Sequence, residues 1–503
     1  MRKHALARLF CVFGVTVSTA VIATGSPCDL DFDNDGVYPS ERDLTAFFDV
    51  FSGAACATCD DIDVNNNGAY PETADVITFL DRISSGSCLG ETDPQPSPDG
   101  AVLTSGAPAD FIEAPTWVRW VAPWGNNNNP GTQSAPFATV QGALMRSNRN
   151  AHGIVYVMPG EYTMAIQWQY DSLQYGGESE DRPLIISAAP GSVTRPILNL
   201  PNTASAGIRL VNGTNHVVVR GLEFRGQPRH TSIIAAIGNA RGLLVEDCVL
   251  IGGTNGVSLQ GLDGQVVRDV TVRRTIIRDQ RNPNTHSQGA YVSASDNVTF
   301  EECVFFNNGN RDTFCQGVYF VHGNYTRRVI DSWFGEPGFA GIQARGGEFV
   351  ITGNVFEKCG NGIGVGHPMA APSGIWTSGI FANNLIAAPV YPGWGIALQR
   401  MNCATIRDNV FFSTFAGGQA LVRQESSPCA NVFGNEVRGW GSPFVNNSGA
   451  IAVGEMIQIP TLQPAPQQQR PAVDWARLMS RPLGVWDLTY ETQTYITACR
   501  QLP

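Results

Sequence analysis

The sequences FEECVF (300–305), VIDSWF (329–334) and ITGNVF (351–356) share one pattern, in which a small or amide residue precedes two apolar residues. Further copies lie on both sides of them. The shared position is occupied by Gly221, Cys248, Thr275, Cys303, Ser332, Asn354, Asn384, Asn409 and Asn435, at intervals of 27, 27, 28, 29, 22, 30, 25 and 26 residues. Self-similarity of this period is the signature of a solenoid, a fold of stacked repeats.

Each repeat is predicted to consist of strands, with no room for a helix. β-Branched and aromatic residues occupy alternate positions, which is the pattern of a strand. A second strand pattern lies in each interval, as in GAYVS (289–293), GVYFV (317–321) and GIQAR (341–345). Two or three strands per coil, stacked about 4.8 Å apart, predict an all-β parallel β-helix. Asparagines at one turn are expected to bond their amides from coil to coil.

The second strand of each coil should present two columns of side chains to the outside, because successive residues point to opposite faces. Val318 and Phe320 are expected to face the core together with Ile342, Ala344, Ile363, Val365, Ile396 and Leu398. The first outward column then runs Ser258, Tyr291, Tyr319, Gln343, Gly364 and Ala397, and the second runs Gln260, Ser293, Val321, Arg345, Gly366, Gln399 and Arg423. We call these outward side chains the wall. His322, His367 and Arg400 follow just past the strand ends.

The chain begins with the features of a secretory signal peptide. Arg2, Lys3 and Arg8 precede an apolar run from Leu9 to Ala23, which predicts a cleaved segment over residues 1–25 and not a membrane span. No other stretch is long and apolar enough to span a membrane. We therefore expect a secreted or cell-surface bacterial protein, in which cysteines can form disulfides.

The net charge of −11 is concentrated near the N-terminus. Between Asp29 and Asp93, 15 acidic residues stand against two arginines, so the remaining body is close to neutral. A body without basic surplus disfavours nucleic-acid binding. Lys3 and Lys358 are the only lysines, so any cationic site in the body must be built almost wholly from arginine. Arginine favours bidentate recognition of carboxylate or sulfate.

Two acidic loops account for the N-terminal charge. CDLDFDNDG (28–36) and CDDIDVNNNG (59–68) place oxygen ligands at alternate positions before a glycine, and a short amphipathic helix pattern follows each. This is the ligand spacing of an EF-hand calcium loop. The predicted ligands are Asp31, Asp33, Asp35 and Asp43 in the first loop, and Asp63, Asn65, Asn67 and Asp75 in a weaker second loop.

The paired loops resemble a dockerin domain over residues 26–90. The resemblance implies a small helical module that binds Ca²⁺ and a cell-surface partner of the cohesin kind. Cys28 and Cys56 bracket one unit and Cys59 and Cys88 the other, so we predict these two disulfides among three possible pairings. An acidic spacer held by cysteines is the alternative. Residues 91–115 have the Pro- and Gly-rich composition of a linker.

Residues 116–455 carry the repeats, and residues 456–503 are expected to form a C-terminal extension or cap. A short helical pattern begins at Thr139, and GIVYVMPGEYTM (153–164) is a strand that ends in a Pro-Gly turn. This entry segment, with HSQGAY (286–291), GIQARGG (341–347) and GIGVGH (362–367), resembles secreted right-handed parallel β-helix proteins of the pectate lyase type. The resemblance covers about residues 117–440. It implies an extended polysaccharide bound along the outward positions of one sheet.

The residue types of the wall favour some of the reactions known for such proteins over others. Glycoside hydrolysis usually needs two carboxyl groups, and the two columns contain none, so Asp279, Asp312 or Glu336 would have to reach over from loops. β-Elimination of a uronic acid needs a cation on the sugar carboxylate, a base and an acid. We predict Arg345 as the cation, and Tyr319 and His322 as base and acid in an order that the sequence leaves open.

The substrate-binding residues are predicted to be Tyr291, Gln343, His367, Gln399 and Arg400. The favoured function is a polysaccharide lyase on an acidic extracellular polysaccharide, with no cofactor assigned in the β-helix. A hydrolase or C5-epimerase on the same scaffold and a non-catalytic glycan-binding or structural surface protein remain alternatives. In the structural interpretation, Tyr291 and Tyr319 are an aromatic pair that only stabilises the sheet.

Cys403 and Cys429 each precede a repeat asparagine by six residues. The same phase in adjacent coils places their Cα atoms about 4.8 Å apart, within the range of a disulfide. We predict this bond. Cys248 and Cys303 share a phase but lie two coils apart, and we expect them to stay unpaired.

Overall fold

The computed structural model describes residues 115–147, 151–167, 176–192, 194–310, 314–321, 323–366, 377–387, 393–399, 401–412, 419–424, 429–438, 442–446, 452–453 and 456–459. The predicted signal peptide, calcium module and linker lie outside the described residues, together with their metal ligands and cysteines. His322, His367 and Arg400 lie outside them as well.

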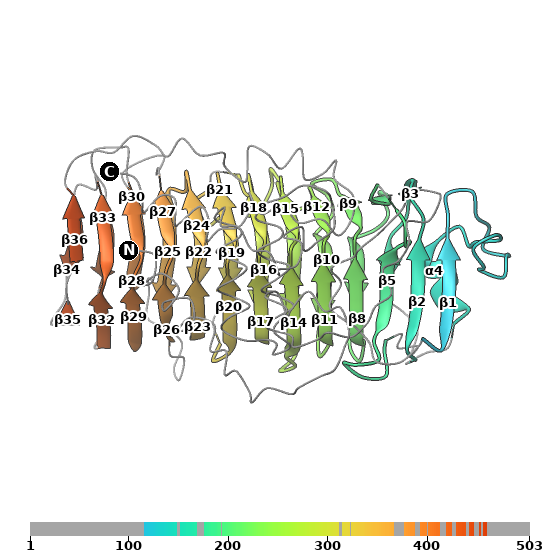
Figure 1. Cartoon of the computed structure of the whole chain (residues 1–503), viewed down its shortest axis with the longest axis horizontal. Helices are drawn as coiled ribbons and strands as arrows, with labels where there is room; N and C mark the ends of the chain where they lie inside the picture. The colour runs from blue at the N-terminus through green and yellow to red at the C-terminus, as the bar shows by residue number, and fades with distance from the viewer. Residues whose placement is uncertain are drawn as a thin grey trace, which may run out of the picture. The chain divides into compact units, whose positions relative to one another are not determined.

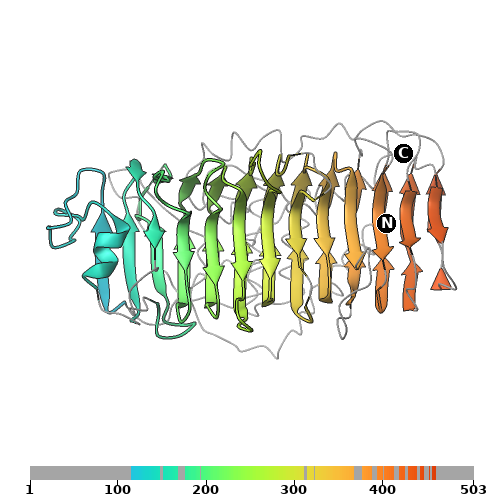
Figure 2. The ribbon, with the colours of Figure 1, turned by 180° about the vertical axis from the view of Figure 1, so that it is seen from behind.

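The described chain winds through three parallel sheets, and each full coil contributes one strand to each sheet in the order A, B, C. β1 pairs in parallel with β2, and from β2 to β33 each strand pairs in parallel with the strand three elements further on, as β16 with β19 and β19 with β22. Figures 1 and 2 show these strands side by side from β1 to β36. The predicted parallel β-helix is confirmed.

Sheet A has 13 strands. They are β1 (Trp117–Val121), β2 (Gly153–Val157), β5 (Leu184–Ala188), β8 (Asn215–Arg220), β11 (Arg241–Glu246), β14 (Val267–Arg273), β17 (Ser295–Glu301), β20 (Thr326–Ile330), β23 (Gly347–Thr352), β26 (Thr377–Ala382), β29 (Cys403–Arg407), β32 (Cys429–Phe433) and β35 (Ala452–Val453).

Sheet B has 12 strands, most of them short. They are β3 (Glu161–Thr163), β6 (Ile197–Asn199), β9 (Glu223–Arg225), β12 (Val249–Ile251), β15 (Ile276–Arg278), β18 (Val304–Phe306), β21 (Trp333–Gly335), β24 (Val355–Glu357), β27 (Leu385–Ala387), β30 (Val410–Phe412), β33 (Asn435–Arg438) and β36 (Met456–Ile459).

Sheet C has 11 strands and carries the wall. They are β4 (Ile166–Gln167), β7 (Ala206–Leu210), β10 (Ser232–Ile237), β13 (Asn255–Gln260), β16 (Gln288–Ser293), β19 (Gln316–Phe320), β22 (Ala340–Ala344), β25 (Asn361–Gly366), β28 (Trp394–Gln399), β31 (Gln419–Gln424) and β34 (Ser442–Asn446).

The corner between sheets A and B is a two-residue turn from β8 to β29. Its first residue has positive φ, as at Asp247 (50°), Glu302 (50°) and Asn383 (54°), a conformation that glycine, asparagine and aspartate adopt most readily. From β11 on, the second residue is the repeated small or amide residue, and its side chain is buried in the core. After β8 the second residue is Leu222 and Gly221 is the first, so the predicted placement of Gly221 at the repeated position is wrong by one residue. We call the column of these second residues the ladder.

Hydrogen bonds run along the ladder from coil to coil. Ser332 N donates to Asn354 Oδ1 at 2.9 Å, and Asn354 donates from both N and Nδ2 to Asn384 Oδ1 at 3.0 Å. The same pair of bonds links Asn384 to Asn409 and Asn409 to Asn435. The predicted amide stacking is therefore confirmed.

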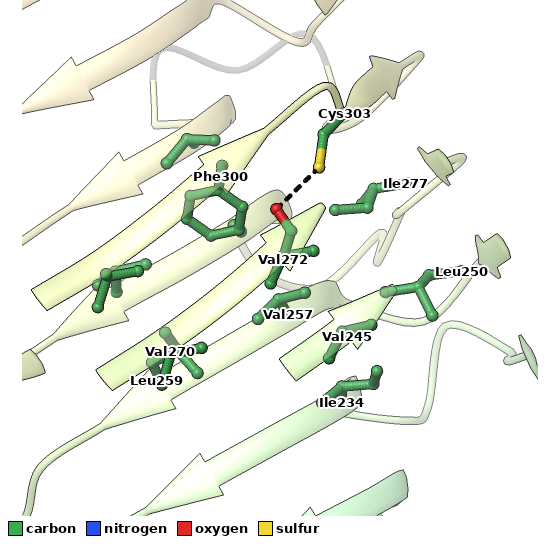
Figure 3. Packing of buried hydrophobic residues seen from close by; sticks show 14 of the residues in the cluster. Ile234, Val245, Leu250, Val257, Leu259, Val270, Val272, Ile277, Phe300 and Cys303 are labelled. Carbon is green, nitrogen blue, oxygen red and sulfur yellow. Dashed lines mark hydrogen bonds between the residues drawn. The ribbon is translucent and has the colours of Figure 1, made fainter. Parts of the chain in front are cut away.

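The core is filled by the inward residues of all three sheets. Val318 and Phe320 are completely buried, as are the inward residues predicted on the adjacent coils, Ile342, Ala344, Ile363, Val365, Ile396 and Leu398. Figure 3 shows the packing around Val257, Val272 and Phe300, where the thiol of Cys303 donates to Val272 O at 3.2 Å. Cys248 and Cys303 are free and buried, as expected.

A stack of phenylalanines explains the glycine that is the second residue of β16, β19 and β22. Phe334 stacks on Phe305 at 4.7 Å and on Phe356 at 4.9 Å between ring centroids. A Cβ atom on Gly341 would lie 2.3 Å from Cδ1 of Phe356, closer than any carbon contact allows. The glycine of the GIQAR pattern is thus required by packing.

The helix α4 (Val140–Met145) packs against β1 and β2 at the N-terminal end of the described coils (Figure 1). Its N-cap is Thr139, whose hydroxyl accepts from Gly142 N at 3.0 Å, so the helix begins where the sequence predicted. Within the described parts of the chain, no helix has the length and apolar character needed to cross a membrane.

Two register predictions concern the C-terminal coils. Cys403 and Cys429 are Cα partners in β29 and β32, the register that the predicted disulfide requires, and the bond itself stays a prediction. The placement of Arg423 is wrong by one residue, because it pairs with inward Leu398 while Gln424 pairs with Gln399. In the preceding coil the second residue of the sheet C strand is Gly395, and in this coil Ala420 takes its place. The sequence therefore offered no glycine from which to count the register of this strand.

Candidate functional site

The first outward column of the wall has the register that the sequence predicted. Tyr291 pairs with Tyr319, Tyr319 with Gln343, and the column continues through Gly364 to Ala397. Its side chains are less open than expected, since Tyr291 and Tyr319 are half-buried and Gln343 is 9% exposed. The wall is therefore a packed face with a few accessible groups.

Arg345 and Tyr319 meet at the centre of the wall. Arg345 directly follows β22, and its Nη1 donates to the Tyr319 hydroxyl at 2.7 Å. The guanidinium carbon lies 5.1 Å from the centroid of the Tyr319 ring, a cation–π distance. The Nε of Arg345 is buried and has no hydrogen-bond partner in the structure. The pair supports the predicted convergence of these two residues, and within the described residues Arg345 bonds to a tyrosine and to no acidic side chain.

Tyr319 is held in its protonated form. Burial raises the pKa of the Tyr319 hydroxyl, Arg345 opposes this, and neighbouring Tyr291, whose ring centroid is 5.9 Å away, adds to it. Because the oxygen accepts from Arg345, the hydroxyl hydrogen is left to donate elsewhere. At neutral pH the arrangement can give a proton to a ligand more readily than it can take one.

Arg327 lies beneath this pair, inside the coil. It is completely buried, and its Nη1 donates to Val321 O at 2.8 Å and to Gly346 O at 3.3 Å. Its Nη2 has no partner, and the rings of Phe320, Tyr325 and Phe349 lie within 6 Å of its guanidinium carbon. Desolvation by burial lowers the pKa of Arg327 to about 10.

The contacts of Arg327 fix the two turns that flank Arg345 and residue 322, so it positions the wall from below. The sequence analysis missed this residue. The signal was present, because Arg327 pairs with inward Val298 and Phe349 and is therefore a charged residue at an inward position.

The remaining predicted binding residues are placed in part. Gln343 Nε2 donates to Gly364 O at 3.3 Å and to Gly366 O at 3.4 Å, so its amide hydrogens are used within the protein. Gln399 is partly exposed and pairs with Gly366. The structure therefore brings together Tyr291, Tyr319 and Arg345, whereas His322, His367 and Arg400 are not among the described residues.

The loop carboxylates of the described chain are engaged away from the wall. Asp279 and Glu336 begin the connections from sheet B to sheet C. Asp279 pairs with Arg278 at 2.8 Å, and Glu336 pairs with Lys358 at 2.7 Å. Among the described residues the outward positions of sheet C hold no aspartate or glutamate, and no cluster of three His, Cys, Asp or Glu could hold a metal ion.

A pocket on the N-terminal part of sheet C was not foreseen. It has a volume of about 320 Å³ and is lined by Ser205, Ala206, Arg209, Thr231, Ser232, Ala235, Ile237, Asn255 and Gln260. The strand register continues the first column of the wall from Tyr291 through Ser258 and Ala235 to Arg209. The pocket is thus part of the same face.

Comparisons with known proteins agree with the fold. A family model described as "Right handed beta helix region" matches residues 206–454, and one described as "Protein of unknown function (DUF1565)" matches residues 124–171. No curated protein matches the sequence. The chain is a right-handed parallel β-helix.

Several solved structures resemble it at low identity. Pectate lyase Pel9A is 14% identical over 65% of this chain and 82% of its own, with a TM-score of 0.43. The GH136 lacto-N-biosidase from Eubacterium ramulus is 12% identical over 68% of each chain, with a TM-score of 0.48. The mannuronan C-5 epimerase AlgE6 A-module from Azotobacter vinelandii is 13% identical over 64% of this chain and 94% of its own, with a TM-score of 0.41. Likeness at this level bears on no activity.

Proposed function

We propose that the protein is a secreted polysaccharide lyase that cleaves an acidic polysaccharide by β-elimination at the wall. The observation that carries the proposal is the Arg345–Tyr319 pair, in which an arginine and a protonated tyrosine 2.7 Å apart occupy adjacent coils of one face. A uronic acid presents a carboxylate beside the carbon that loses its proton. The reaction therefore needs a cation and a proton donor close together.

In this proposal Arg345 neutralises the sugar carboxylate. One N–H of its Nη1 is used by Tyr319, and the described residues accept no further hydrogen bond from its two Nη atoms, so the guanidinium retains donors for an anion. Pairing the carboxylate with a cation stabilises the negative charge that develops when the neighbouring carbon is deprotonated. Arg327 supports the turn after β22 through Gly346 O and adds a second buried positive charge below.

Tyr319 acts as the acid, because its oxygen accepts from Arg345 and its hydroxyl hydrogen is left to donate to the substrate. The base, which we propose to be His322, takes the proton from the carbon beside the carboxylate. A carbon–carbon double bond forms, the bond to the glycosidic oxygen breaks, and this oxygen receives the Tyr319 proton. The sequence had left the order of acid and base open, and the hydrogen bond that Tyr319 accepts from Arg345 is the reason for this assignment.

The alternatives differ in product. An epimerase would return a proton to the opposite face of the carbon without breaking the chain, and a binding protein would leave the polymer unchanged. Hydrolysis is disfavoured because two of the three loop carboxylates that could reach the wall, Asp279 and Glu336, are bonded to Arg278 and Lys358. The third, Asp312, lies outside the described residues.

The test exposes the secreted chain to acidic and neutral polysaccharides and follows the ultraviolet absorbance of an unsaturated product while the fragments are sized. We expect absorbance and shorter chains from a uronate polymer, and loss of both in Tyr319→Phe and Arg345→Lys. Retained binding without any unsaturated product from every uronate would replace the lyase with a glycan-binding protein. Full activity in Tyr319→Phe would move the site elsewhere.

We also propose that residues 26–90 bind Ca²⁺ through the acidic loops and attach the protein to a cohesin-like surface partner. The alternate spacing of Asp31, Asp33 and Asp35 before Gly36 supports the metal part. Calorimetric titration of the chelator-treated protein with calcium tests it. Absence of any calcium-dependent heat at millimolar calcium would leave the module as an acidic spacer.

A further inference from the structure

The pocket around Arg209 holds a cation with no partner. Arg209 is half-buried, points outward from β7, and makes no hydrogen bond or ion pair within the described residues. No carboxylate lines the pocket. A guanidinium that is partly removed from water and unpaired carries a desolvation cost that an anionic ligand would relieve.

The other lining groups suit a sugar. Ser232 is 3% exposed, and its hydroxyl makes no hydrogen bond within the described residues. Asn255 uses its carbonyl oxygen to accept from Gln288 N at 3.2 Å, which leaves its amide N–H groups to donate. Gln260 donates to Ser258 at 2.6 Å and keeps its carbonyl oxygen to accept. One cation with hydroxyl and amide groups matches a carboxylate and ring hydroxyls better than an apolar ligand.

Only small side chains lie on the outward face between Arg209 and the tyrosines. The outward residues on the two intervening coils are Ala235 and Ser258, and Tyr291 is the first large side chain after them. Arg209 lies five strands from β22, which Arg345 follows, so the two cations are separated by about 24 Å along the stack. A single sugar unit cannot contact both.

We infer that the Arg209 pocket is a remote subsite for an acidic sugar unit, and that the wall binds an extended acidic chain with one carboxylate at Arg345 and another at Arg209. This inference rests on the proposed function, which supplies the polymer. A consequence is that the affinity of the protein for acidic oligomers should increase with oligomer length until the oligomer is long enough to reach from Arg345 to Arg209.

The experiment measures, by calorimetry, the affinities of the secreted protein for uronate oligomers from the disaccharide upward. In the wild type we expect the long oligomers to bind at least about tenfold more tightly than the short ones, the gain of one buried charge-assisted contact. Arg209→Gln should remove this ratio, and Arg209→Lys should restore part of it. Arg241→Gln is the matched control, because Arg241 is exposed on sheet A and pairs with Asp269 there.

A ratio unchanged in Arg209→Gln, with thermal stability also unchanged, overturns the inference. If Arg345→Gln still abolishes binding in that case, the proposed function stands without the remote subsite. If no acidic oligomer of any length binds the wild type, the proposed function fails and the inference fails with it. Uncharged oligomers of equal length should show no dependence on Arg209. Sulfated neutral oligomers that bind as tightly as uronates would assign the pocket to sulfate.

Discussion

The ladder and the wall are built from the same coils, yet they differ in whether their polar side chains have hydrogen-bond partners. On the ladder, Asn384 uses both its amide oxygen and its amide nitrogen in bonds to neighbouring coils. On and beneath the wall, Arg345 Nε and Arg327 Nη2 are buried without partners, and Arg209 has none in the described residues.

This difference separates what holds the fold from what is available to a ligand. A buried polar group without a partner costs about 1 to 3 kcal/mol of free energy of unfolding. On one corner the stack satisfies its amides coil after coil, whereas on the wall Arg209 is half-buried, without a partner in the described residues and within reach of an anion. Variants of the ladder should therefore affect stability most, and variants of the wall should affect ligand binding and turnover most.

The largest expected loss of stability comes from Asn384→Leu. Leucine has a similar size but cannot accept from Asn354 N and Nδ2 or donate to Ile351 O and Asn409 Oδ1. We expect the free energy of unfolding to fall by about 4 kcal/mol, measured by chemical denaturation.

The matched variant is Thr275→Val on the same ladder. Thr275 accepts only from Cys248 N, at 3.4 Å, and donates to Arg273 O at 2.9 Å, so the loss should be about 1 to 2 kcal/mol. Equal losses in the two variants would show that the amide stack adds nothing to the corner.

The next largest effect should come from the predicted Cys403–Cys429 bond, a covalent tie between adjacent coils. Cys403→Ser should lower the free energy of unfolding by about 3 kcal/mol by freeing a loop of the unfolded chain. Thermal unfolding with and without a reductant measures it, and Cys303→Ser, which changes a free thiol, is the control. A peptide map with Cys403 as a free thiol would contradict the bond.

On the wall the effect on stability should be small and the effect on turnover large. Tyr319→Phe loses the bond from Arg345, worth about 1 kcal/mol, because Tyr319 is half-buried. Loss of a donor aimed at the developing charge should lower turnover about a hundredfold. Product absorbance and denaturation curves on one preparation test both effects. A stability loss as large as that of Asn384→Leu would show that the wall stabilises the fold as much as the ladder does.

The smallest expected effect is a pKa change at Tyr319. Since Arg345 lowers the pKa that burial raises, Arg345→Gln should move the ionisation of Tyr319 to still higher pH. The raised pKa stabilises the folded state below the pH at which the unfolded tyrosine ionises, and this contribution is lost as pH rises through the folded pKa. Phenolate absorbance, with Tyr319→Phe subtracted to assign the signal, measures the change. A shift to lower pH would mean that Arg345 does not face the hydroxyl.

Much of the ladder and of the wall register was predictable from the sequence. The ladder follows the repeat length of the coils, and the wall follows the two-residue alternation of a strand. The interval between repeated residues identified Asn354, Asn384 and Asn409, and alternation placed Tyr319 opposite Gln343. In the coil that has Ala420 in place of the glycine found in the preceding coil, the predicted register was wrong by one residue, and Arg423 was therefore assigned to the wrong column.

Side-chain contacts could not be derived from period. Whether Arg345 meets a loop acid or Tyr319 depends on rotamers, and the packing of Arg327 among Phe320, Tyr325 and Phe349 depends on three separate turns. The Arg209 pocket had a sequence signal, since Arg209 in GIRLV has the phase of Tyr319. Its depth, however, comes from Ala235 and Ser258 on other coils.

The two-residue corner between sheets A and B has a consequence for how such a chain can diversify. That corner keeps one length from β8 to β29, whereas the connection from sheet B to sheet C ranges from three residues (252–254) to nine (307–315). Insertions and deletions are thus absorbed at the edge of the binding face and leave the stacking of the coils untouched. A lineage of such proteins can lengthen its loops, or add whole coils, and so acquire new ligands while its scaffold is inherited unchanged.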